Sequence, residues 1–253
     1  MHRSLRSRLT FLTLVLLIAL GLAGCQTAGL QDTAATAATI AALTKAPTRA
    51  AVTPTPGKRV KNTPSDFDFY VMSLSWSPDF CAGNDDPQQC SVGKKLGFVL
   101  HGLWPQYNRG YPADCSNVKL PKDTMTKFPN LYPSTNLYTH EWDKHGTCSG
   151  LSPTDYLTLA KTLKGSIMIP ADYGSPTQAF RTTVADLKAA FIAANSTLSE
   201  EALAVQCSGS GRFLQELRVC FSRDGQPTAC SQEVQNDAAK SCGNANFLVR
   251  NVK

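Results

Sequence analysis

Cysteine constrains the fold of this chain more than any other residue type. The chain begins with a segment typical of exported proteins, and all nine of its cysteines lie at or after the end of that segment. Residues 1–8 carry three arginines, residues 9–20 are largely apolar, and small residues follow, which is typical of a signal peptide over residues 1–24. The apolar run of about 12 residues is shorter than the roughly 20 that a membrane-spanning helix needs. An exported chain reaches an oxidising compartment, where cysteines form disulfides.

Cys25 is interpreted differently from the other cysteines. The segment from Leu22 to Cys25 resembles a bacterial lipoprotein box, which predicts cleavage before Cys25 and a lipid on that residue. An ordinary secretory signal with an unrelated cysteine is the alternative. The remaining eight form an even set and predict a disulfide framework: Cys81, Cys90, Cys115, Cys148, Cys207, Cys220, Cys230 and Cys242. Eight cysteines can pair in roughly a hundred ways, so their spacing leaves the connectivity open.

The chain divides into a tether and one domain. Residues 26–64 are dominated by Ala, Thr and Pro and cannot bury enough apolar surface to fold, so residues 25–65 are expected to be a flexible tether behind the lipid. Residues 66–253 have the length of one domain. Eight of the 25 basic residues and one of the 19 acidic residues precede residue 66, which leaves a net charge of −1 in the domain. The domain therefore lacks the broad basic surface of a general nucleic-acid binder.

Strands and helices mix in this domain without regular βαβ alternation, which predicts an α+β fold. Aromatic and apolar runs predict strands at 67–76, 96–100, 213–221 and 246–250. Helices are expected around His140, from Ser152–Pro153 to near Gly165, and from Pro176 onward with Phe180 on its apolar face. Asp224-Gly225 should form a turn after the third strand.

All histidines beyond the leader lie in two short segments, 98–105 and 139–148. Histidine can take and give a proton near neutral pH, which suits acid–base chemistry. His140 and Lys144 are four residues apart, and so are Glu141 and His145, so each pair is expected to be neighbours on a helix surface. His101 would come from the end of a strand and face this cluster.

The sequences FVLHGLWP at 98–105 and HEWDKHGTC at 140–148 resemble the two active-site segments of the ribonuclease T2 family, and residues 76–81 and 110–115 extend the resemblance. It covers roughly 66–253. It implies a central, mostly antiparallel sheet flanked by helices and stapled by disulfides. It also implies a monomeric, metal-free acid endoribonuclease that acts on single-stranded RNA with weak base preference, without a cofactor.

The resemblance also implies a role for each histidine. His145 would be the base toward the 2′-hydroxyl of RNA, and His101 the acid toward the leaving 5′-oxygen. Glu141 and Lys144 would stabilise the pentavalent phosphorane, and His140 would help to hold the phosphate. The sequence alone does not decide which histidine is the base. Since one must be neutral and the other protonated, activity should peak below neutral pH.

Base contacts are expected from Trp104, with Tyr111 as its partner, because stacking accepts any base and gives low specificity. Ordinary packing is the alternative for both side chains. Some relatives carry an acidic residue where this chain has Gln106, which leaves the base preference open. The family's disulfides imply the pairs Cys81–Cys90, Cys115–Cys148, Cys207–Cys242 and Cys220–Cys230. The second pair would link the two active-site segments.

Three other functions fit the sequence less well. A zinc metallopeptidase would use His140-Glu141 and a second histidine four residues on, but His145 is five residues on, about 500° around a helix, so the two rings diverge. No CxxC pair occurs either, and no metal site is expected. A non-catalytic RNA-binding module leaves the filled catalytic positions unexplained. A structural envelope lipoprotein explains the tether but not the two histidine segments. If Cys25 is lipidated, Gln26 after it favours retention at an outer membrane; a soluble periplasmic or secreted protein is the alternative.

Overall fold

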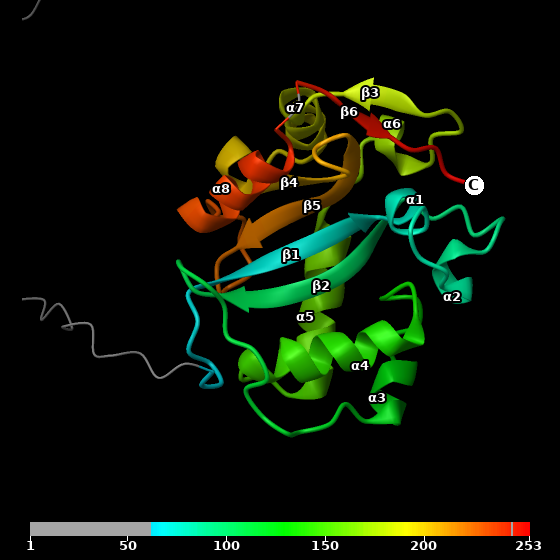
Figure 1. Ribbon diagram of the computed structural model, residues 1–253. Helices are drawn as coiled ribbons and strands as arrows, with labels where there is room; N and C mark the ends of the chain where they lie inside the picture. The colour runs from blue at the N-terminus through cyan, green and yellow to red at the C-terminus, as the bar shows by residue number, and fades with distance from the viewer. Residues whose placement is uncertain (1–61, 244) are drawn as a thin grey trace, which may run out of the picture. The chain divides into compact units, whose positions relative to one another are not determined.

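The computed structural model describes residues 62–243 and 245–253 (Figure 1). The described residues all belong to one compact unit. The expected signal peptide, the lipidated Cys25 and nearly all of the expected tether lie outside the described residues. Within the described part, no helix combines the length and the apolar character that crossing a bilayer requires.

Six strands form one sheet in the order β2-β1-β5-β6-β3, with β4 paired to β5 as well. The strands are β1 (Phe69–Trp76), β2 (Phe98–Gln106), β3 (Phe180–Thr182), β4 (Leu203–Ser208), β5 (Phe213–Phe221) and β6 (Phe247–Val249). Every pairing is antiparallel except β5 with β6. The prediction of an α+β fold with a mostly antiparallel sheet is confirmed.

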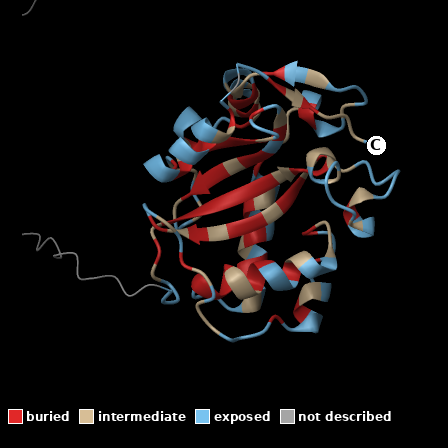
Figure 2. Ribbon diagram, viewed as in Figure 1, coloured by how far each residue is buried: buried red, intermediate tan, exposed pale blue. Residues whose placement is uncertain are grey.

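Helices cover both faces of this sheet, which explains why β1 is an almost unbroken buried run (Figure 2). Successive strand side chains point to opposite faces. Met72 and Leu74 of β1 belong to the main core cluster, on the face where Figure 1 shows α5 behind β1 and β2. Phe69 and Val71 belong to a smaller cluster on the other face, beneath α8.

The structure describes eight α-helices, half of which begin after a residue whose side chain caps the first turn. They are α1 (Ser77–Phe80), α2 (Pro87–Cys90), α3 (Lys122–Thr126), α4 (Thr135–Lys144), α5 (Pro153–Ser166), α6 (Ala171–Gly174), α7 (Val184–Ala194) and α8 (Gln232–Ser241), with 3₁₀ turns η1 (Gly146–Cys148) and η2 (Glu200–Ala202). The Ser152 hydroxyl accepts a hydrogen bond from the third residue of α5, and Ser231 does the same for α8. The predicted helix from Ser152 is confirmed.

The four disulfides have the pairings that the family resemblance implied: Cys81–Cys90, Cys115–Cys148, Cys207–Cys242 and Cys220–Cys230. Cys207–Cys242 fastens α8 to β4, and Cys220–Cys230 fastens the segment before α8 to β5. Two of the four disulfides therefore join segments more than 30 residues apart, at separations of 33 and 35, and the other two close short loops.

The predicted helix from Pro176 is wrong at its start. Phe180 lies in β3, which pairs with β6, and the helix begins only at Val184, where Thr183 caps it. Pairing with a strand near the C-terminus is a long-range contact that helical periodicity does not report. The strand predicted at 96–100 is also longer in the structure, because β2 continues to Gln106, and His101 lies inside it rather than at its end.

Candidate active site

A β-bulge in β2 sets the position of His101. Ser73 of β1 pairs with Gly102 and Leu74 pairs with Leu100, so His101 is the extra residue on β2. Bulges bend a strand and redirect a side chain, and they often occur beside active sites. His101 leaves the regular ladder here and is about one third exposed.

The end of α4 supplies the second group of side chains. His140, Glu141 and Lys144 lie in its last turns, and His145 is the C-terminal cap residue. Glu141 and His145 are buried, whereas His140 is exposed. The two histidines of this segment therefore differ in environment, although they are only five residues apart.

These side chains line one cavity of about 290 Å³. Its walls are His101, Trp104, Gln106, Tyr111, His140, Glu141, Lys144, His145, Arg218, Glu233, Val234 and Asp237. The structure thus brings together all seven residues that the sequence singled out for catalysis or base binding. It adds Arg218 from β5 and two carboxylates from α8.

Glu141 is fixed in this cavity by Trp104, whose indole N–H donates a 2.7 Å hydrogen bond to Glu141 Oε2. Glu141 Oε1 is buried without a hydrogen-bond partner in the described part and lies 3.8 Å from His101 Nε2. Burial raises the pKa of Glu141 to about 7, against the opposing effects of His101, the Trp104 hydrogen bond and Lys144. A Cβ atom at Gly102 would collide with both Glu141 Oε2 and Trp104 Nε1, so this position requires glycine.

Glu216 of β5 holds the other nitrogen of His101. His101 Nδ1 and Glu216 Oε1 are 2.7 Å apart, and Ser75 donates to the same oxygen at 3.3 Å. Burial alone would lower the pKa of His101, but the hydrogen bond and charge of Glu216, with the charge of Glu141, raise it overall. The pKa of Glu216 is lowered to about 2, because the contacts with His101 and Arg218 outweigh its burial.

His145 lies in a different environment. Its ring centroid is 5.4 Å from that of Trp104 and 6.0 Å from that of Tyr111. Its Nδ1 has no hydrogen-bond partner among the described residues. Burial, followed by the positive charges of Lys144 and the other two histidines, lowers the pKa of His145 to about 3. His145 is therefore neutral under conditions where His101 is protonated.

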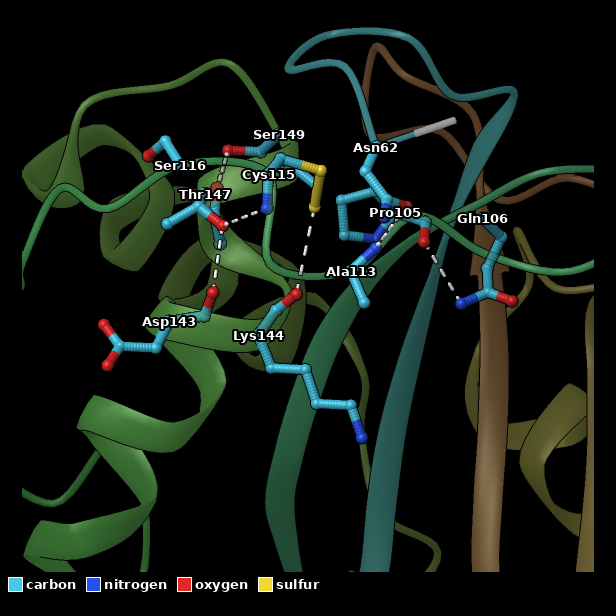
Figure 3. The surroundings of a disulfide bond; sticks show 12 residues. Asn62, Pro105, Gln106, Ala113, Cys115, Ser116, Asp143, Lys144, Thr147 and Ser149 are labelled. Atoms are coloured by element: carbon cyan, nitrogen blue, oxygen red, sulfur yellow. Dashed lines mark hydrogen bonds between the residues drawn. A yellow bond between two sulfur atoms is a disulfide. The ribbon is translucent and has the colours of Figure 1, made fainter. Parts of the chain in front are cut away.

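The Cys115–Cys148 disulfide fastens the loop after β2 to the end of α4 (Figure 3). The Cys115 amide donates to the Thr147 hydroxyl, which in turn donates to the Asp143 carbonyl oxygen. The Asp114 amide donates to the Lys144 carbonyl oxygen at 2.9 Å. The loop that carries Tyr111 is thus tied to the turn that carries Lys144, whose side chain extends away from the disulfide in Figure 3.

Sequence reasoning missed the residues that β5 and α8 contribute. Glu216 and Arg218 are charged residues in a largely apolar strand, and these charges are the feature of the sequence that could have identified them as site residues. Glu233 and Asp237 are one helical turn apart on α8, a helix that was not predicted. Asp143 lies near the C-terminal end of α4 and pairs with Lys119 at 2.9 Å.

Metal binding was also considered. In residues 62–243 and 245–253, no group of three or more His, Cys, Asp or Glu side chains is arranged to hold a metal ion. The geometry described above instead offers two imidazoles of opposite proton affinity, an ammonium group and a carboxyl group around one cavity. This set can transfer protons and neutralise an anion.

Comparisons with known proteins show the family to which the chain belongs. The sequence model of the ribonuclease T2 family matches residues 67–230. A ribonuclease of Aeromonas hydrophila is 40% identical over 210 residues, which cover 77% of this chain and 91% of that protein. A probable ribonuclease of Haemophilus influenzae is 31% identical over 127 residues, which cover 44% of this chain and 47% of that protein.

Solved structures show the same fold. An RNase-related protein from Calystegia sepium has a TM-score of 0.57 at 20% identity and covers 74% of this chain and 97% of its own. A mutant of ribonuclease MC1 in complex with 5′-UMP has a TM-score of 0.57 at 20% identity and covers 75% of this chain and 99% of its own. The chain is an endoribonuclease and belongs to the ribonuclease T2 family.

Proposed function

We propose that this enzyme cleaves single-stranded RNA by transphosphorylation, without a metal and with low base specificity. The 2′-hydroxyl attacks the adjacent phosphorus, the 5′-oxygen leaves, and a 2′,3′-cyclic phosphate forms, which water opens more slowly to a 3′-phosphate. One observation carries the proposal: two histidines of opposite proton affinity line a single cavity. The first step needs one group that accepts a proton and one that donates a proton.

His145 is assigned as the base. It is neutral above a pH of about 3, because burial and nearby cations disfavour its charged form. A neutral imidazole has one nitrogen free to accept the proton of the 2′-hydroxyl. Its place between the rings of Trp104 and Tyr111 also limits the directions in which it can turn.

His101 is assigned as the acid. Glu216 occupies Nδ1 and favours the imidazolium form, which leaves the Nε2 proton on the side facing Glu141 and the cavity. From there Nε2 can protonate the departing 5′-oxygen, so that no alkoxide is released. In the second step His101 would accept a proton from the attacking water, and His145 would return its proton to the 2′-oxygen.

Lys144 and Glu141 are assigned to stabilise the phosphorane, and exposed His140 to help hold the phosphate. An ammonium group placed where negative charge develops lowers the barrier. Glu141 supports the same role at acidic pH, because below its pKa of about 7 it carries a proton that it can donate to a phosphate oxygen. Above that pH its carboxylate would repel the phosphate. Both effects favour activity below neutral pH.

Base contacts are assigned to Trp104 and Tyr111, of which Tyr111 is 51% exposed at the cavity wall. Stacking on these rings accepts any base, and Gln106 beside them adds no charge. A second cavity of about 520 Å³ meets the first at His101. Since His101 protonates the leaving oxygen, the leaving nucleoside enters this second cavity. The bound 5′-UMP of the ribonuclease MC1 mutant is consistent with a nucleotide-sized site on this fold.

We also propose that the protein is exported as a monomer and attached to the cell envelope through a lipid on Cys25, with the outer membrane favoured by Gln26. The leader supports this proposal. Cys25→Ser should release active enzyme into the periplasmic or culture fluid, whereas the wild-type protein should fractionate with membranes. Recovery of both proteins in the soluble fractions would favour the soluble alternative.

The test of the catalytic proposal is incubation of purified protein with RNA at pH 4–8, with and without EDTA, and identification of the product ends. Cyclic phosphate ends should appear first, and EDTA should not change the rate. His101→Ala and His145→Ala should each lose about 10²–10⁴ of activity while melting as cooperatively as wild type. Near-normal turnover by either variant, or a need for metal, would overturn the proposal.

A further inference from the structure

A third cavity lies next to the one assigned to the leaving nucleoside. It has a volume of about 350 Å³ and shares Ala82, Gln89 and Arg250 with its larger neighbour, which in turn meets the catalytic cavity at His101. A strand of RNA that leaves His101 in the 3′ direction would follow a path along these adjoining cavities toward the third one.

Charge differs between the two ends of this path. Lys94, Lys95 and Lys253 line the third cavity, all three are exposed, and no aspartate or glutamate lines it. None of these lysines forms an ion pair with another residue in the described part of the chain. At the opposite end, the catalytic cavity carries Lys144 and Arg218 together with Glu233 and Asp237, so charges of both signs meet there. Phosphates that continue beyond the leaving nucleoside are therefore attracted to the lysine end.

The fold holds the lysines at this place. The Lys95 amide donates a 3.2 Å hydrogen bond to the main-chain oxygen of Lys253, which joins the loop before β2 to the C-terminal segment. Figure 1 shows that segment ending beside α1 and α2. The Cys81–Cys90 disulfide lines the same cavity and ties α1 to α2. The lysines thus come from two ordered segments that meet.

We propose that the third cavity binds the phosphates that follow the leaving nucleoside on its 3′ side, so that the enzyme prefers RNA extended in that direction. This inference rests on the proposed function, since His101 as the acid sets the direction of the strand. It also accounts for RNA binding by a domain whose net charge is −1, because the phosphate contacts are concentrated at one end of the site.

Substrates with a single ribonucleotide test the inference, because they have only one cleavable bond. The short substrate is a ribouridine followed by one deoxyadenosine. The 3′-extended substrate has three deoxyadenosines after the ribouridine. The 5′-extended substrate has one deoxyadenosine after it and two before it, and so carries the same charge. The measured quantity is kcat/KM for each extended substrate divided by that for the short one.

For wild type the 3′-extended ratio should be about tenfold or more in low salt, the scale of one charge-assisted phosphate contact, and the 5′-extended ratio should stay near one. Lys94→Gln, Lys95→Gln and Lys253→Gln combined should bring the 3′ ratio to within about twofold of one. The three substitutions should also make the slope of the logarithm of this ratio against the logarithm of the salt concentration less steep by about 1.4, the value for two phosphates of a single strand. The control combines Lys122→Gln, Lys161→Gln and Lys240→Gln, exposed lysines that line none of the three cavities.

An unchanged 3′ ratio in the first triple variant, or equal wild-type ratios for both extensions, would overturn the inference. Failure of wild type to cleave the short substrate would instead contradict the proposed function. In that case the inference is still tested by fluorescence anisotropy with all-deoxy oligonucleotides, which lack the attacking hydroxyl. Weaker binding by the first triple variant than by the control supports it, and equal binding refutes it.

Discussion

Replacing Glu216 by glutamine tests whether this buried carboxylate keeps His101 protonated. Glutamine preserves the size of the side chain and an oxygen that can accept from His101 Nδ1, which lies 2.7 Å from Glu216 Oε1. It removes the negative charge. Glu233→Gln is a matched control, because Glu233 lines the catalytic cavity with His101 but forms no hydrogen bond or ion pair with it in the described structure.

The magnitude follows from the kind of hydrogen bond that is lost. A hydrogen bond to a charged group contributes about 1.5–3 kcal/mol and a neutral one about 0.5–1.5 kcal/mol. The difference, of the order of 1.4 kcal/mol, reduces the ratio of protonated to neutral His101 about tenfold. Since Glu216 raises the pKa of His101, its removal lowers that pKa. At the high-pH end of the profile, where loss of the His101 proton limits the rate, kcat/KM should therefore fall about tenfold. At pH 4.5, where His101 is protonated in both proteins, it should stay within about threefold.

The assay is kcat/KM from pH 4 to 8.5 on the short substrate described above, with thermal melting of each variant at both ends of the range. Glu216→Gln should move the decline at high pH toward lower pH, and Glu233→Gln should leave that decline in place. A uniform loss at every pH would mean that Glu216 has only a structural role. A profile identical to wild type would refute the reasoning altogether.

Three other changes are expected to have measurable effects. Gly102→Ala pushes a Cβ atom into the Trp104–Glu141 hydrogen bond and should lower kcat about 10²-fold, the scale of a 1 Å misplacement; activity within threefold of wild type would contradict the steric argument. Wild type should lose about 3 kcal/mol of its free energy of unfolding between pH 4 and pH 8, because the buried Glu141 has a folded pKa of about 7 instead of 4.5 and must ionise in that window; Glu141→Gln should remove this loss. Denaturant unfolding at both pH values measures it, and an equal effect of the substitution at both would contradict burial as the cause. Cys115→Ser with Cys148→Ser opens a loop of 33 residues, worth about 4 kcal/mol of stability, and should lower activity at temperatures below the melting transition; loss of activity only on unfolding would exclude a local role for this disulfide.

Local patterns in the sequence predicted the elements that carry the motifs. β1 and β5 are rich in aromatic and apolar residues, and α5 has its cap, its proline and its acidic first turn close together. These signals lie within about ten residues, so they can be seen without knowing the fold. The pairings of the disulfides came from the family resemblance, because spacing alone allows very many.

Features that depend on distant pairing were not predicted. Phe180 fits a helical face, yet it lies in β3 because β6, nearly 70 residues later, supplies a hydrogen-bonding partner. The bulge at His101 depends on the register between β2 and β1, which no local pattern records. α8 is short and its apolar positions are few, since it covers only the small cluster beneath it.

The assignment of base and acid shows the same limit at the level of chemistry. His101 and His145 are the same side chain, each within a motif that the sequence displays, and the motifs alone do not show which histidine is buried and which is paired with a distant carboxylate. The difference comes from Glu216, which is 115 residues from His101 and raises its pKa, whereas the burial of His145 beside Lys144 lowers its pKa. An acidic residue placed beside His145 as well would leave two protonated imidazoles and no base at acidic pH. The proposed direction of proton transfer therefore depends on the folded sheet, in which β1 lies between β2 and β5, and not on the histidine motifs alone.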